Sequence, residues 1–322
     1  MLRYFARRLA FALLLVFVVS SAALLLTRLA PGDFASDVFG AGASPETVAR
    51  ERIRYGLDRP VLVQYVSWLV GAVGLDLGTS LMYGRPVRGL VLQRAGNTAL
   101  LAATALAVAT LVGLPLGVVS GSRRRGVLTT LIRGASLVFL SLPSLLTSLL
   151  LVLIAARTGW FPIGGMFSID AASSGWGAFC RDLLWHLPVP TLALALPVAA
   201  TLERLQSQAT AETIAEPFAT AARARGIPWR RLVWRDLLRV AIRPVASIYG
   251  LVLAGLLSGS FVVEIVTAWP GLGRLMYDAL RARDLYLVAG CAAMGSVFLA
   301  VGSLVSDLAL AAVDPRLRGE QA

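Results

Sequence analysis

Residues 9–27 read LAFALLLVFVVSSAALLLT, a run without a single charged side chain. A helix rises about 1.5 Å per residue, so a run of this length can cross the roughly 30 Å hydrocarbon core of a bilayer. Arg3, Arg7 and Arg8 precede it, as in a secretory signal, but the apolar run is longer than the core of a cleaved signal. We therefore predict a retained membrane-spanning helix at the start of the chain.

Five further apolar runs predict additional membrane-spanning helices, at residues 97–121, 131–156, 187–200, 245–267 and 285–313. The run at 187–200 is short and rich in proline, which leaves its end poorly defined. Gly113, Pro115 and Gly117 in the second run would allow close helix approach, and Pro143 in the third would allow a kink. The sequence thus predicts an all-α membrane protein with six transmembrane helices.

The composition supports this class and argues against others. Of 322 residues, 57% are hydrophobic and 15% are charged, whereas soluble domains carry roughly a quarter charged residues. The mean hydropathy is +0.75. The net charge of +12 rests on arginine alone, because the chain has no lysine, and the arginines gather between the apolar runs. A nucleic-acid-binding protein would instead spread its basic charge over a soluble surface.

Metal and thiol chemistry have few candidate residues. The chain has one histidine, His186, and two cysteines, Cys180 and Cys291. These cannot supply four zinc ligands or a thiol-redox pair at motif spacing, so we predict no metal site. We expect His186 to lie at the membrane interface rather than to bind nickel. Both cysteines could lie towards the outer side, and a disulfide between them stays open.

The distribution of arginine predicts the topology, because short cytoplasmic loops retain positive charge. With the N-terminus inside, 17 of the 30 arginines lie in the cytoplasmic segments. We therefore predict that both termini are cytoplasmic, which makes residues 31–93 an external segment. Within it, Ser44-Pro45-Glu46 predicts the start of a helix that ends at Gly56, and a second helix at 61–70 would carry Tyr65 and Trp68 at the membrane–water interface. This cap could simply shield helix ends or provide a docking surface.

The loop at residues 200–244 is the most informative internal segment. We predict two helices in it, at 203–224 and 228–242, separated by Gly226-Ile227-Pro228. The second helix would carry four arginines at i,i+4 spacing, and like charges so placed repel one another. These are Arg231, Arg235, Arg239 and Arg243. Anionic lipid headgroups, the favoured interpretation, or an acidic protein surface would offset this repulsion.

The same loop carries an Ala-Ala pair, three residues and then Gly, at Ala221, Ala222 and Gly226. This resembles the coupling loop of bacterial ABC-importer permeases, whose general pattern is Glu-Ala-Ala-x-x-x-Gly, with Thr220 here in the place of Glu. The form Ala-Arg-Ala-Arg-Gly at 222–226 is similar to the branch that imports dipeptides, oligopeptides and nickel. Asp236 and Val240 stand where that branch often has His and Asn, so we assign them no role.

Other segments resemble this branch in the same order along nearly the whole chain. They are Pro31-Gly32-Asp33, Gly56-Leu57-Asp58-Arg59-Pro60, Asp76-Leu77-Gly78-Thr79-Ser80, Arg94 with Asn97-Thr98, Glu264, Trp269-Pro270-Gly271-Leu272-Gly273, Arg283-Asp284, and Asp314-Pro315-Arg316. The resemblance implies a type I ABC-importer permease fold in the bacterial inner membrane. Its domains would be an N-terminal transmembrane helix at 1–30, an external cap at 31–93, a five-helix core at 94–313 with a cytoplasmic coupling loop at 201–244, and a cytoplasmic tail at 314–322.

The resemblance also implies the partners. Such a permease has no active site: a second homologous permease subunit completes the pathway, two ATPase subunits bind ATP and Mg²⁺, and an external solute-binding protein delivers a di- or oligopeptide. A Walker-type phosphate loop needs a lysine, which this chain lacks, so we expect no cofactor in the chain itself. Membrane lipids would be further partners.

Two groups of candidate site residues follow from the resemblance. The ATPase-coupling element would be formed by Glu216, Thr220, Ala221, Ala222, Arg223, Arg225 and Gly226, although Gly226 also fits a helix-ending glycine. The candidates for an outer gate or pathway are Glu264, Trp269, Pro270 and Gly271. Glu264 could instead pair with Arg274, and we expect Trp269 at the level of the lipid headgroups.

Three alternatives remain at this point. The same machinery could import nickel or another small solute. A self-contained secondary transporter would favour inverted repeats and broken helices, of which the sequence gives no clear sign. An intramembrane hydrolase would need a catalytic dyad or metal cluster within the spans, and the sequence offers none.

Overall fold

The computed structural model describes residues 2–29, 34–35, 44–123, 125–168 and 175–313. Within these residues the chain is almost entirely helical, and the β structure is limited to one isolated bridge between Thr79 and Pro86. The predicted tail at 314–322 and the Pro31-Gly32-Asp33 segment lie outside the described residues. The described chain divides into two compact units: the first contains residues 100–269 and 301–313, and the second contains residues 2–99 and 270–300.

Four described helices are long and apolar enough to cross a membrane by themselves. They are α1 (Leu2–Leu29), α5 (Val87–Ser122), α13 (Tyr249–Val266) and α15 (Leu285–Val313). Two bent helix pairs raise the number to six if each pair is one span. The predicted all-α membrane class is therefore confirmed, and the helix predicted at 97–121 begins ten residues earlier, at Val87.

The third predicted span is not one straight helix. It is divided into α6 (Val127–Ser141) and α7 (Ser144–Thr158), whose axes differ by 107°. The break falls at Leu142, which has extended backbone angles (φ −89°, ψ 118°). A proline disfavours helical geometry in the residue before it, so Pro143, where the sequence predicted a kink, explains why the apolar run at 131–156 forms two helices.

The fourth span is longer than predicted. The helix α9 (Pro188–Ala215) follows α8 (Trp176–His186) at an angle of 44° and continues well beyond Ala200. It ends where Glu216 takes an extended conformation (φ −66°, ψ 145°) in front of Pro217. The helix predicted over 203–224 is therefore wrong as a single element, because Pro217 starts a separate helix, α10 (Pro217–Ala224).

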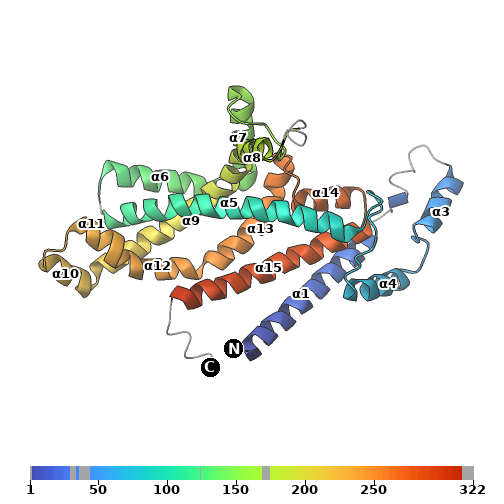
Figure 1. Ribbon diagram of the computed structural model, residues 1–322, viewed down its shortest axis with the longest axis horizontal. Coiled ribbons are helices and arrows are strands. Elements are labelled where there is room, and N and C mark those ends of the chain that lie inside the picture. The colour runs from blue at the N-terminus through green and yellow to red at the C-terminus, as the bar shows by residue number, and fades with distance from the viewer. Residues whose placement is uncertain (1, 30–33, 36–43, 124, 169–174, 314–322) are drawn as a thin grey trace. The chain divides into compact units, whose positions relative to one another are not determined.

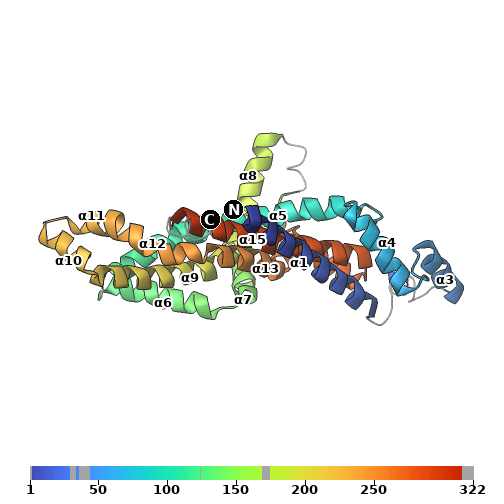
Figure 2. The ribbon, with the colours of Figure 1, turned by 90° about the horizontal axis from the view of Figure 1, so that it is seen from below.

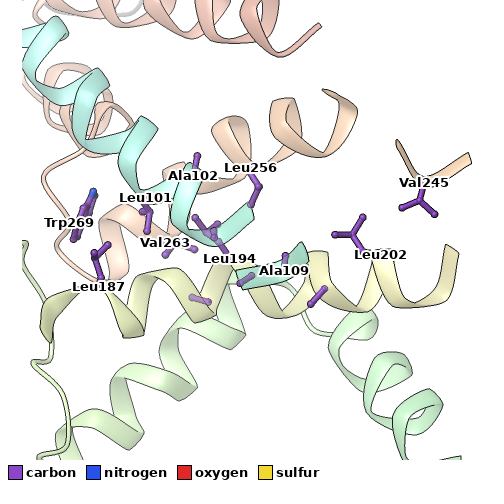
Figure 3. Packing of buried hydrophobic residues seen from close by; sticks show 14 residues of the cluster. Leu101, Ala102, Ala109, Leu187, Leu194, Leu202, Val245, Leu256, Val263 and Trp269 are labelled. Atoms are coloured by element: carbon purple, nitrogen blue, oxygen red, sulfur yellow. The ribbon is translucent and has the colours of Figure 1, made fainter. Parts of the chain in front are cut away.

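The core of the first unit lies between α5, α9 and α13. Figure 3 shows Leu101, Ala102 and Ala109 of α5 beside Leu194 and Leu202 of α9, with Leu256 and Val263 of α13 in the same cluster. Two hydroxyl pairs add polar contacts between these helices: Thr104 and Thr191 lie 3.2 Å apart, and Tyr249 donates to Thr110 over 3.0 Å. Hydrogen bonds of this kind help hold helices together where lipid surrounds them.

Three glycines of α5 allow the backbone of α9 to approach closely. A Cβ added at Gly113 would lie 2.5 Å from the Ala199 carbonyl oxygen, and one at Gly117 would lie 2.6 Å from the Glu203 carbonyl oxygen. At Gly121 the added Cβ would come still closer to the Ser207 carbonyl oxygen. We call this line of small residues the α5–α9 glycine contact. It follows the small-xxx-small pattern of packed membrane helices.

The second unit contains the predicted external helices. The helix α3 (Pro45–Arg54) begins after Ser44, whose hydroxyl accepts a hydrogen bond from the Thr47 N–H, and Gly56 follows it with a φ of +64°. The helix α4 (Val61–Val73) packs on α1, where the hydroxyls of Ser21 and Tyr65 are 2.9 Å apart. Trp68 is buried in one apolar cluster with Leu24 of α1 and Ala289 of α15, and its expected position at the membrane–water interface stays a prediction.

A buried carboxylate holds the start of α15 in the same unit. Asp284 follows α14 (Leu272–Arg281), is fully buried, and accepts hydrogen bonds from the Leu287 and Met82 N–H groups and the Ser80 hydroxyl. It therefore caps α15 and ties the segment before α5 to it. Both cysteines are free thiols in the structure, Cys180 exposed and Cys291 buried.

Candidate functional site

The predicted coupling residues lie in a short helical hairpin that follows α9 (Figure 1). After α10 the chain turns at residues 225–228, which we call the coupling turn, and enters α11 (Trp229–Arg231). A π-helical segment, η2 (Leu232–Leu237), and α12 (Leu238–Ser247) complete the return. Both α10 and η2 pack on the end of α9, so the hairpin is anchored to a candidate membrane span.

Small side chains on one face of α10 make this packing close. Ala219 and Ala222 are 1% and 5% exposed, and they lie in one apolar cluster with Leu232, Val233 and Leu237 of η2. Val118 of α5 and the partly buried Ile214 and Ile227 belong to the same cluster. The structure thus places Ala222 in the interior of this chain, where its methyl group joins α10 to η2.

The coupling turn has the hydrogen bonds of a Schellman motif. The Gly226 N–H donates to the Arg223 carbonyl over 2.9 Å, and the Ile227 N–H donates to the Ala222 carbonyl over 3.2 Å. Gly226 has a φ of +80°, a conformation that favours glycine, and no atom lies within 4 Å of where its Cβ would be. The prediction of a helix-ending glycine is therefore confirmed, and the space around this turn is open.

The other face of α10 and the residues that flank the helix are exposed. These exposed residues include the predicted Glu216, Thr220, Ala221, Arg223 and Arg225. Sequence reasoning missed two aromatic residues on this surface, Phe218 and Trp229, which are 41% and 37% exposed. The Arg223 guanidinium lies over the Trp229 ring at 4.5 Å from its centroid, which supports the orientation of both side chains. Large apolar residues within a polar loop were the signal that could have identified them.

The predicted arginine stripe is interrupted by η2. All four arginines, Arg231, Arg235, Arg239 and Arg243, are exposed, but Arg231 ends α11, Arg235 lies in the π-helical segment and the last two lie in α12. The wider turn of a π-helix changes the angle between residues four apart. The single regular helix expected over 228–242, with one straight row of charge, is therefore wrong.

The candidate gate residues fall in the two different units. In the first, Glu264 is fully buried in α13, and Trp269 is also fully buried, in the cluster that contains Leu187 (Figure 3). The indole of Trp269 packs in the protein core, and its expected position at the headgroup level stays a prediction. Ala268, with a φ of +53°, is the point at which the chain turns after α13.

In the second unit, Pro270 and Gly271 precede α14 and are held by α5. The Asn97 side-chain amide donates to the Pro270 carbonyl over 2.8 Å, and the Leu272 N–H donates to the Thr98 hydroxyl over 2.7 Å. These two contacts give a physical reason for the Asn97-Thr98 pair, which sequence analysis had noted only as part of a resemblance. They position the turn rather than a reactive group.

Among the described residues no group of three or more His, Cys, Asp and Glu side chains could hold a metal ion. His186 is 7% exposed, and its Nδ1 lies 2.8 Å from the Asp182 carbonyl oxygen. This contact is to the preceding turn of its own helix, so it is consistent with a structural role for the imidazole.

Comparison with known proteins places these features in a family context. Residues 113–319 match the family model described as binding-protein-dependent transport system inner membrane component, and residues 1–99 match the N-terminal part of such membrane components. The chain is 33% identical to a putative peptide permease protein of Brucella suis, over 99% of both chains. It is 30% identical to the oligopeptide transport system permease protein AppB of Bacillus subtilis, over 98% of this chain and 99% of AppB. It is 32% identical to the oligopeptide transport system permease protein OppB of Mycobacterium bovis, over 99% of both chains.

Proposed function

The chain belongs to the family of binding-protein-dependent transport system inner membrane components, and from this premise we propose how it takes part in peptide import. It is a multi-pass protein of the bacterial inner membrane and a permease of the ABC-importer class. We propose that it forms half of the pathway for di- or oligopeptides. The substrate class is supported by the full-length similarity to permeases named for peptide and oligopeptide transport.

The proposal includes partners that complete the pathway. A second permease subunit would form the other half, an external solute-binding protein would deliver the peptide, and two ATPase subunits would bind ATP and Mg²⁺ in the cytoplasm. The chain has no lysine and hence no Walker-type phosphate loop, which supports the assignment of ATP hydrolysis to partner chains. We expect the purified chain alone to hydrolyse no ATP, and robust hydrolysis by a contaminant-free preparation would contradict this part of the proposal.

The observation that carries the coupling mechanism is the contrast between the two faces of α10. One face packs through Ala219 and Ala222 on η2, while the other presents Phe218 and Ala221. If an ATPase groove receives the exposed face, a movement of the ATPase shifts α10, and the buried face transmits that shift to η2 and α9. Packed interfaces of this kind switch between discrete arrangements rather than deform continuously, as alternating access requires.

An uptake assay in the native bacterium tests the substrate class. The gene for this chain would be deleted, and uptake of radiolabelled tri- and tetrapeptides would be compared before and after complementation with the full chain. We expect deletion to abolish saturable peptide uptake and complementation to restore it, with ⁶³Ni²⁺ uptake unchanged. Loss of nickel uptake with normal peptide uptake would contradict the peptide assignment and leave the importer class intact.

A further inference from the structure

We propose that a groove between α6 and α9 binds an anionic phospholipid of the cytoplasmic leaflet. Figure 2 shows α6 running alongside α9, and the two helices pack on each other. Two clefts, of about 280 and 340 Å³, lie along this contact and share Ser136 and Glu203 as lining residues. We call the two together the α6–α9 groove. All of its lining residues belong to the first unit, and the groove is separate from the coupling residues.

One arm of the groove is apolar. It is lined by side chains from three helices: Val112 and Leu116 of α5, Leu131 and Phe139 of α6, and Leu196 of α9. Leu131 is 65% exposed, so this arm opens to the surroundings of the helices rather than into the core. Its chemistry suits an acyl chain.

The other arm, which we call the polar arm, holds the basic side chains of the groove beside the apolar Leu137, Leu140 and Ala211. Arg133 of α6 lines it together with Arg204 and Gln208 of α9, and both arginines are exposed. One guanidinium nitrogen of Arg133 donates to the Ser120 carbonyl over 3.2 Å, which holds the group at the groove. A guanidinium has five N–H donors in a geometry that matches phosphate, so this bond leaves capacity for a ligand.

Glu203, at the junction of the arms, does not cancel this charge. Its side chain is 2% exposed, and its Oε1 accepts a hydrogen bond from the Ser120 hydroxyl over 2.5 Å. Two guanidinium groups against one inward-facing carboxylate leave the polar arm net positive. The electrostatic potential in the polar arm therefore favours binding of an anionic headgroup.

The positions of the two arms along α9 match the depths of a lipid's acyl chain and headgroup in the membrane. At about 1.5 Å per residue, Arg204 lies about 24 Å and Gln208 about 30 Å along the helix from Pro188, compared with a hydrocarbon core of about 30 Å. The polar arm therefore reaches the headgroup boundary on the side where the arginine excess predicts the cytoplasm. Basic pockets between membrane helices on this side bind anionic headgroups. A helix of a second permease could cover Leu131 and Phe139, but it would leave both arginines without an anion.

Lipid retention by the purified full chain tests the proposal. The chain would be delipidated in mild detergent, titrated with phosphatidylglycerol or phosphatidylcholine, and examined by native mass spectrometry. We expect one phosphatidylglycerol to stay bound to the parent chain. Each arginine removed should weaken this binding about fivefold, so the double variant R133Q/R204Q should weaken it about 25-fold. The matched control, R50Q/R54Q, removes the same charge from α3 and should leave the affinity unchanged.

A second variant tests the apolar arm without changing charge. Ala135 lines this arm, and Ala135→Trp would fill it. We expect this variant to lose the retained lipid while its melting temperature stays near that of the parent. Equal binding of both lipids, or unchanged binding in both R133Q/R204Q and Ala135→Trp, would overturn the proposal. A further test places a cysteine at position 135 and labels it in the purified transporter. Protection of this cysteine by the second permease, rather than by lipid, would also overturn the proposal.

Discussion

The α5–α9 glycine contact and the coupling turn both depend on glycine, but for opposite reasons. At Gly113, Gly117 and Gly121 the absence of a side chain lets two helix backbones approach within the core of the first unit. At Gly226 nothing lies within 4 Å of the missing Cβ, and glycine is needed for the backbone angle alone. The first region is closed by packing and the second is open to a partner.

Under the proposed function, this difference separates what holds the permease together from what would connect it to the ATPase subunits. A substitution in the glycine contact must displace the backbone of α9, so it should damage folding and, through folding, transport. A substitution at the coupling turn meets open space, so it should damage assembly or transport while the chain still inserts. Substitutions in the two regions therefore test the contrast separately, one through stability and the other through transport.

The largest effect is expected from Gly117→Leu. The new side chain would meet the Glu203 carbonyl and the Gln206 side chain, and its Cβ alone would lie 2.6 Å from either. Overpacking of this kind costs about 3 kcal/mol or more. Thermal unfolding in mild detergent should show a large loss of stability, with little folded chain in the membrane. Gly134→Leu is the matched control, because Gly134 of α6 has open space around it, and it should behave like the parent.

Gly226→Trp should abolish transport while leaving membrane insertion intact. Its bulk would project from the coupling turn, and a φ of +80° costs a non-glycine residue about 1–2 kcal/mol. Uptake of labelled peptide, normalised to the amount of chain in the membrane, measures the effect. Gly226→Asn should keep most of the activity, since asparagine tolerates this backbone region. Normal uptake by a well-expressed Trp variant would contradict the proposed role of the turn.

Ser120→Ala should have an intermediate effect on stability. The substitution removes the hydroxyl that donates a hydrogen bond to the buried Glu203 carboxylate, which should lower the free energy of unfolding by about 1–3 kcal/mol. The melting temperature of the detergent-solubilised chain would fall accordingly. Ser122→Ala removes a hydroxyl that bonds only to its own helix, at the Val119 carbonyl, and should change little. Equal effects of the two variants would show that the Ser120–Glu203 bond does not stabilise the contact between α5 and α9.

The smallest effect is expected at the edge of the coupling turn. Arg223→Gln removes the cation from the Trp229 ring, an exposed interaction worth about 0.5–1 kcal/mol. A double-mutant cycle with Trp229→Leu isolates this pair energy from other changes. Arg225→Gln, one residue from the turn glycine, serves as the comparison for loss of charge alone. A coupling energy of zero would remove the stated reason for the orientation of Trp229.

Sequence patterns predicted the helical class and the apolar spans. They did not predict the full effect of two prolines: Pro143, where a kink was expected, divides a long apolar run into α6 and α7, and Pro217 separates α10 from α9. Hydropathy cannot distinguish these breaks from tolerated prolines such as Pro115 and Pro197, which lie inside helices. Whether a proline bends or ends a helix depends on neighbours that restore the lost backbone hydrogen bonds.

The candidate site was also predicted only in part, because the burial of each residue depends on packing between elements that are apart in the sequence. The resemblance identified Ala221, Ala222 and Gly226 as a group, but it did not separate the buried Ala222 from the exposed Ala221, because that depends on η2 packing against α10. The same packing exposes Phe218, which no pattern had singled out. The coupling role of the exposed residues, and the gate role of Glu264, Trp269, Pro270 and Gly271, stay predictions.

Affinity purification of the tagged full chain from its native membrane tests the central claim most directly. The chain would be extracted in mild detergent, and its partners would be quantified by mass spectrometry for the parent and for Phe218→Arg. We predict that the parent brings down a second permease and ATPase subunits, and that Phe218→Arg keeps the permease but loses the ATPases. A parent chain that is stable and alone, or a variant that keeps its ATPases in full, would contradict the account.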